Sequence, residues 1–217
     1  MSGEGRRLGR ERGTRIGRAS ILLAALLLAP GAERAVACAC CSDEGLRIET
    51  RAVLSSGEAE EIGRIVLAPR ARLRMGPGYP DDVHGIAAPG DGWLDIAARW
   101  VDGGIEFDVG SPGGAGGRIA VSLERVLERF EVDTGRGEGM SAGGGPDLYK
   151  EWRMIGRAEL SGALFTATSP AEARLILQGG GNLCTSAESF ARWMLILKGG
   201  GADFALLGET VRAGDGN

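Results

Sequence analysis

Apolar and polar side chains alternate along several short segments of the chain, and this alternation predicts β-strands. In Ile105–Val109, three apolar residues alternate with two acidic ones, so one face of the segment can be buried while the other meets water. Asp102-Gly103-Gly104 joins this segment to Trp93–Val101, and an Asp-Gly turn favours a tight hairpin. The pattern therefore predicts a β-hairpin over residues 93–109.

Further apolar segments of strand length are bounded by glycine, proline or serine, which predicts strands separated by turns. They are Arg64–Ala68 continuing after Pro69 as Arg70–Met75, then Arg118–Leu123, Met154–Leu160, Ala163–Ala167, Leu175–Leu177, Trp193–Leu197 and Phe204–Leu207. Glycine accounts for 38 of the 217 residues and has no collagen-like period, which fits strands joined by glycine turns.

Helix is predicted only as short turns. The spacings Ser-x-x-Glu at Ser55–Glu58 and Thr-x-x-Glu at Thr185–Glu188 are typical of a capping box that opens a helix. Ser169–Glu172 resembles a third helix start, with proline at the first helical position. Glu124–Arg129 has apolar residues at helical spacing, so we expect the strand before it to run into a helical turn.

About nine strands with turns between them predict an all-β fold. We expect a two-sheet antiparallel β-sandwich with short helical turns, and a small barrel is the alternative. The four tryptophans are expected to fill its core rather than to form a platform for sugars; they are Trp93, Trp100, Trp152 and Trp193.

The beginning of the chain has the three parts of a secretory signal peptide. Six arginines precede the apolar run Ile21–Ala29, Pro30-Gly31 ends that run, and Ala35-Val36-Ala37 supplies small residues before a cleavage point. The run is shorter than the roughly 20 residues of a membrane-spanning helix. We therefore expect residues 1–37 to be removed, leaving 38–217 as a single β-rich domain with glycine-rich loops in the periplasm or outside the cell.

Cys38 follows the small residues directly, so it is a candidate for lipidation. Bacterial lipoprotein signals have a Leu-small-small-Cys pattern, and Ala35 stands here in place of the leucine. We expect simple cleavage after Ala37, with a lipid anchor on Cys38 as the alternative.

The charge of the remaining chain limits its partners. The leader holds seven of the 25 basic and three of the 29 acidic residues, which leaves 18 and 26 and a net charge of −8. Binding to nucleic acid needs clustered positive charge, so we expect no nucleic-acid partner. Residues 38–217 contain no segment long and apolar enough for a transmembrane span.

Four cysteines are the strongest candidates for chemistry: Cys38, Cys40, Cys41 and Cys184. In an exported protein we expect a disulfide from the N-terminal cluster to Cys184. The alternative is a thiolate site for zinc or copper(I), which Cys184 or His84 would complete. Apart from these metals we expect no cofactor.

Two further motifs are not expected to carry catalysis. Gly139–Gly143 matches Gly-x-Ser-x-Gly, but it lies among glycines without the strand and helix that a nucleophile elbow requires. Asp81-Asp82-Val83-His84 holds the only histidine and fits a solvated loop. We assign no catalytic residue and expect a non-catalytic module that binds an unknown protein or envelope component. A periplasmic metal-handling protein is the alternative, and a carbohydrate-active hydrolase using carboxylates and tryptophans is the second alternative.

Overall fold

A computed structural model describes residues 47–74, 82–87, 89–133, 148–168, 170–181 and 186–211. The chain divides into two units, Met1–Ala37 and Cys38–Asn217, and all described residues belong to the second. Its elements are β1 (Arg47–Val53), α2 (Ser56–Gly63), β2 (Val66–Leu73), β3 (Trp93–Val101), β4 (Gly104–Gly110), β5 (Gly116–Asp133), β6 (Leu148–Ser161), β7 (Ala171–Gly181), η1 (Ala187–Ser189), β8 (Phe190–Gly199) and β9 (Ala202–Val211).

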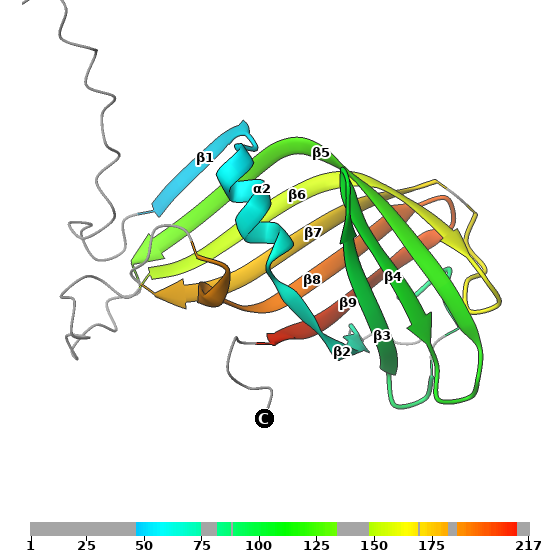
Figure 1. Cartoon of the computed structure of the whole chain (residues 1–217). Helices are drawn as coiled ribbons and strands as arrows, with labels where there is room; N and C mark the ends of the chain where they lie inside the picture. The colour runs from blue at the N-terminus through cyan, green and yellow to red at the C-terminus, as the bar shows by residue number, and fades with distance from the viewer. Residues whose placement is uncertain are drawn as a thin grey trace, which may run out of the picture. The chain divides into compact units, whose positions relative to one another are not determined.

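The strands form one closed antiparallel barrel (Figure 1). From β2 to β9 each strand pairs with the next one along the chain, and β9 returns to pair with β2, which closes an eight-stranded barrel. This is an up-and-down topology, and closure satisfies the backbone groups that an open sheet would leave at its edges.

The all-β prediction is confirmed, and the expectation of a two-sheet sandwich is wrong. The barrel that stood as the alternative is what forms. Both architectures require strands with one buried face, so alternation alone does not separate them. The deciding contact is the pairing of β2 with β9, where Val66 lies opposite Val211 at the other end of the described chain.

Strand β5 is unusually long and serves two neighbours on the same edge. Its first part pairs with β4 and its last part pairs with β1, a ninth strand that the sequence analysis did not predict. The register of β5 against β6 shifts between Leu123 and Leu127, where the strand has a bulge. Gly156 of β6 lies against this bulge, and a Cβ there would lie 2.1 Å from the carbonyl oxygen of Ser122.

Residues 124–130 show helical spacing although they form strand, because both faces of this part of β5 carry apolar residues. Leu127 is buried inside the barrel, whereas Val126 and Phe130 lie on the outer face and pair with β1. The predicted helical turn over Glu124–Arg129 is therefore wrong.

The predicted helix start at Ser169–Glu172 is also wrong, because β7 begins at Ala171. Ala163–Ala167 is not a strand either; Phe165 makes only an isolated bridge to Ile86.

The predicted hairpin over residues 93–109 is confirmed. Val101 pairs with Gly104, so Asp102 and Gly103 form the two-residue turn between β3 and β4. Gly103 has φ 73°, a left-handed conformation that glycine adopts without steric cost. The predicted segments near 154–160, 175–177, 193–197 and 204–207 are confirmed as strands, each longer than expected.

Side chains fill the interior of the barrel. Trp193 lies inside it, 1% exposed, with its ring centroid 5.5 Å from that of Phe107. Trp152 and Phe190 form a second aromatic pair at 5.0 Å. The prediction that tryptophans fill the core is confirmed for Trp152 and Trp193, while Trp100 is half-buried and Trp93 points outward.

Helix α2 packs across the end of the barrel at which β1 joins β5. The predicted capping box is present: the Ser55 side chain accepts a hydrogen bond from the Glu58 amide, and the Glu58 carboxylate accepts one from the Ser55 amide. Ile62 is buried, and Glu58 forms an ion pair with Arg129 of β5. In the described ranges no helix has the length and apolarity needed to cross a membrane.

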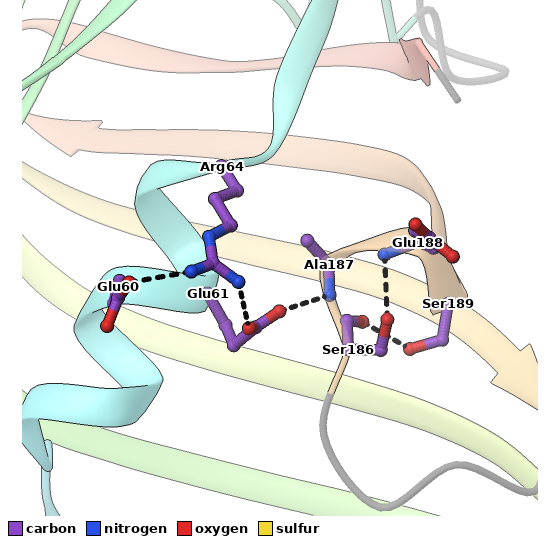
Figure 2. Close-up of polar contacts among 7 residues, drawn as sticks. All are labelled: Glu60, Glu61, Arg64, Ser186, Ala187, Glu188 and Ser189. Carbon is purple, nitrogen blue, oxygen red and sulfur yellow. Dashed lines mark hydrogen bonds and ion pairs between the residues drawn. The ribbon is translucent and has the colours of Figure 1, made fainter. Parts of the chain in front are cut away.

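The other end of α2 is joined to η1 by one carboxylate (Figure 2). Glu61 accepts a hydrogen bond from the Ala187 amide at 2.8 Å with one oxygen and pairs with Arg64 at 2.8 Å with the other. Ser186 caps η1 by accepting a hydrogen bond from the Glu188 amide. The predicted second helical turn therefore exists as a three-residue 3-10 helix, and the Thr185 that was expected to open it lies outside the described residues.

Because Glu61 links two segments that are far apart in the chain, Glu61→Ala is expected to lower the free energy of unfolding by about 1–2 kcal/mol. Glu60→Ala is the matched control, because Glu60 is 67% exposed and contacts only Arg64 on its own helix, a contact worth about 0.5 kcal/mol or less. Urea unfolding of both variants measures the difference. Equal losses would contradict a linking role for Glu61.

Candidate functional site

The residues predicted to carry chemistry are not brought together in the described chain. The four cysteines and Gly139–Gly143 lie outside the described residues, so the disulfide, lipidation and metal predictions stay predictions. His84 and Asp82 are exposed, as expected for a solvated loop, and the His84 backbone pairs with that of Asp203 through hydrogen bonds of 3.0 and 3.1 Å. Within the described ranges no three potential metal ligands cluster.

A hollow on the surface lies at the seam where the barrel closes. Between Leu67 and Ala71 the register of β2 against β9 shifts, so that three residues of β2 bulge out opposite a single residue, Glu209. Pro69 is at the centre of this bulge. Proline has no amide hydrogen for the ladder and is tolerated in strands at such bulges. The seam is thus locally open on the outer face.

Trp93 stands beside this bulge with two arginines over its ring. It is the first residue of β3, it pairs with Arg72 of β2, and it is 36% exposed. The guanidinium carbons of Arg70 and Arg72 lie 4.9 and 5.8 Å from the ring centroid. Asp91 accepts a hydrogen bond from the Trp93 amide at 3.1 Å. These contacts hold an aromatic ring and two cations together on the surface.

We name the hollow at this place the seam groove. It has a volume of about 580 Å³, and its lining consists of Ala68, Pro69, Arg70, Trp93, Arg192, Leu207, Gly208 and Glu209. One wall is apolar, from Pro69 and Leu207, and the other walls carry the tryptophan and two arginines. Glu209 contributes the one negative charge of the lining.

The arginines at the seam groove are available to a ligand. Over the described part of the chain, Arg70, Arg72 and Arg192 have no carboxylate at ion-pair distance, whereas Arg64, Arg129 and other arginines do. A guanidinium without a partner offers a planar fork that binds a carboxylate or phosphate with two hydrogen bonds. The seam groove therefore combines an aromatic edge with unpaired cations.

A second group of ionisable residues lies on the inner face of β5 and β6. Lys150 is 1% exposed, and its burial lowers the pKa of the amine, while the nearby Glu131 opposes this shift. Asp133 is also buried. Two residues along β6, the indole N–H of Trp152 is buried without a hydrogen-bond acceptor in the structure.

On the outer face of β6 and β7, three polar side chains form a hydrogen-bond network. Tyr149 donates a hydrogen bond of 2.5 Å to Glu151, and Gln178 donates one to each of them. Burial, together with the neighbouring carboxylate, raises the pKa of Tyr149 to about 12, so the phenol stays protonated and donates. We assign this network to strand cohesion.

The seam groove was not predicted from the sequence, since all four tryptophans were expected in the core. One signal was present: Arg70 and Arg72 alternate with the buried Ala71 and Leu73, so they had to share the outer face of their strand. The arrival of Trp93 beside them depends on the pairing of β2 with β3, which no local pattern reveals.

No protein-family model, curated protein or solved structure matches the chain.

Proposed function

We propose that this protein is an exported, non-catalytic binding module that takes an acidic saccharide in the seam groove. The predicted leader and the cysteine cluster support a location in the periplasm or outside the cell, where acidic polysaccharides of the envelope are available as ligands. The barrel serves as the rigid support that holds the groove open.

One observation carries this proposal: an exposed tryptophan lies beside two arginines that have no carboxylate partner in the described chain. A flat aromatic side chain packs against the apolar face of a sugar ring with little loss of conformational entropy. The guanidinium forks of Arg70, Arg72 and Arg192 match the carboxylate of a uronic acid. Local positive charge on an otherwise acidic chain favours an anionic ligand at this place.

Binding is favoured over catalysis by the composition of the groove. A glycosidase needs two carboxyl groups about 5–10 Å apart on either side of the scissile bond, and Glu209 is the sole carboxylate among the groove-lining residues. The metal-handling alternative depends on the cysteines and has no further support from the described residues.

Binding of a uronic-acid oligosaccharide and of its neutral analogue, measured by calorimetry, tests this function. We expect the acidic oligosaccharide to bind and the neutral one to bind at least about tenfold more weakly. Trp93→Ala and the double variant Arg70→Ala/Arg72→Ala should each weaken binding by about tenfold or more, since each removes one type of contact.

Arg174→Ala is the matched control, because Arg174 is an exposed strand arginine of β7 away from the groove. It should leave the affinity unchanged. Equal affinity for the two oligosaccharides, no binding of either, or wild-type affinity in the Trp93→Ala variant would each overturn the proposal.

A further inference from the structure

Strand β1 is the one strand of the described chain that has a neighbour on one side only. Its partner is β5, over all seven residues from Arg47 to Val53. Every other described strand has neighbours on both sides, because the barrel is closed. Figure 1 shows β1 as the outermost strand beside β5, and six of its seven residues are exposed. In the described ranges, the backbone N–H and C=O groups along its outer edge therefore have no partner strand.

The outer face of β1 presents alternating charge beside this edge. Glu49 and Arg51 both lie on the outer face, since they pair with Phe130 and Glu128 of β5. Their side chains are 71% and 62% exposed, so both are accessible to a strand that adds to the edge.

Within the chain these two side chains are only loosely paired. Glu49 lies 3.4 Å from Arg153, and Arg51 lies 3.6 Å from Glu128. Arg153 is itself held by Glu151 at 2.6 Å and stacks on Phe130 at 5.1 Å. Arg153 is therefore fixed mainly by Glu151 and Phe130, and Glu49 and Arg51 of β1 can still pair with charges of another chain.

An antiparallel copy of the same strand matches these charges in one register. With Thr50 opposite its own copy, Glu49 lies opposite Arg51 of the second chain, and Arg51 lies opposite Glu49. On the inner face the same register places Ile48 opposite Ala52. Opposite charges in directly facing positions stabilise a pair of strands, and like charges destabilise it.

The two neighbouring registers that also place outer-face residues opposite outer-face residues do not pair opposite charges. A shift that centres the pair on Glu49 sets Glu49 against Glu49 and Arg47 against Arg51, and a shift to Arg51 sets Arg51 against itself. The sequence of β1 thus selects the Thr50-centred register by charge.

We propose that β1 pairs with β1 of a second copy of this chain, antiparallel and with Thr50 at the two-fold axis, so that the two sheets become continuous. Such an interface is isologous, which is the commonest way in which proteins form homodimers. Main-chain hydrogen bonds supply the attraction, and the two Glu49–Arg51 contacts fix the register.

Sedimentation velocity of the whole protein, recovered from an exporting host over a range of concentrations, tests the dimer. We expect a reversible dimer for the wild type. Glu49→Arg and Arg51→Glu should each raise the dissociation constant by about tenfold or more, because each variant places like charges opposite one another twice.

Mixing the two single variants distinguishes charge repulsion from a damaged fold, because only correctly folded chains can restore dimerisation. The Glu49→Arg chain carries arginine at both positions 49 and 51, and the Arg51→Glu chain carries glutamate at both. An equimolar mixture should therefore form heterodimers with wild-type affinity or better. The double variant Glu49→Arg/Arg51→Glu should again form homodimers. Glu159→Arg, an equal charge change at an exposed position of β6, is the control and should dimerise like the wild type.

A wild type that stays monomeric at its highest soluble concentration would overturn the proposal. So would single variants that dimerise as tightly as the wild type, or a mixture of the two that does not associate.

Discussion

Replacing Trp193 with alanine is expected to lower the free energy of unfolding by about 3–5 kcal/mol, the range measured for large aromatic side chains lost from protein cores. Trp193 is 1% exposed and packs against Phe107 inside the barrel. Its indole N–H donates a hydrogen bond of 3.1 Å to the Glu209 carbonyl. The alanine variant loses the apolar contact, leaves a cavity and removes that donor.

Trp93→Ala is the matched control for this prediction, since it makes the same change at an outward-facing residue. It should change the stability by about 1 kcal/mol or less, the worth of an exposed aromatic–cation contact. Urea unfolding followed by circular dichroism measures both variants. If Trp93→Ala destabilised the protein as much as Trp193→Ala, the assignment of Trp193 to the core and Trp93 to the surface would be wrong.

Replacing Cys184 with serine is expected to cost about 4–5 kcal/mol in the oxidised protein. The predicted disulfide from the N-terminal cluster closes a long loop, with Cys41 and Cys184 lying 143 positions apart. In the loop-entropy model, a cross-link over such a length removes about that much conformational entropy from the unfolded chain.

The strands from which the chain leads to Cys41 and to Cys184 have these ends at the same end of the sheet. The cross-strand register runs from Arg47 of β1 through β5 and β6 to Gly180 of β7, a distance of three strand spacings or about 14 Å. Cys41 precedes Arg47 by six residues and Cys184 follows Gly180 by four. At about 3.3 Å per residue, these lengths of chain are sufficient to close the gap.

Peptide mass mapping without reductant, together with unfolding in the presence and absence of reductant, measures this prediction. The wild type should lose stability on reduction, and Cys184→Ser should be insensitive to reductant if its remaining cysteines form no structural bridge. Equal stability of wild type and variant under oxidising conditions, with Cys184 found as a free thiol, would contradict it.

The local pattern of apolar and polar residues was sufficient to predict strands that have one buried and one exposed face. The hairpin over residues 93–109 could be predicted in full, because its alternation and its Asp-Gly turn agree. The capping box at Ser55 and Glu58 could also be predicted, because both of its hydrogen bonds join residues three positions apart in the sequence.

Features that depend on distant pairing could not be predicted. The choice between sandwich and barrel depends on the contact of β2 with β9, and β1 is exposed on both faces, so it has no apolar alternation to reveal it. Apolar residues on both faces of β5, at Val126, Leu127 and Phe130, imitate the spacing of a helix. The seam groove could not be predicted either. It lies on the outer face, at a bulge of β2, and at the β2–β9 pair that closes the barrel.

The most direct measurement of ligand binding at the seam groove is a titration of the labelled protein with a uronic-acid oligosaccharide, followed through the indole N–H signals of its four tryptophans by nuclear magnetic resonance. Binding in the groove predicts that the Trp93 signal shifts most and saturates with the affinity found by calorimetry. An unchanged Trp93 signal at saturating oligosaccharide, or a larger shift at Trp100, would contradict it.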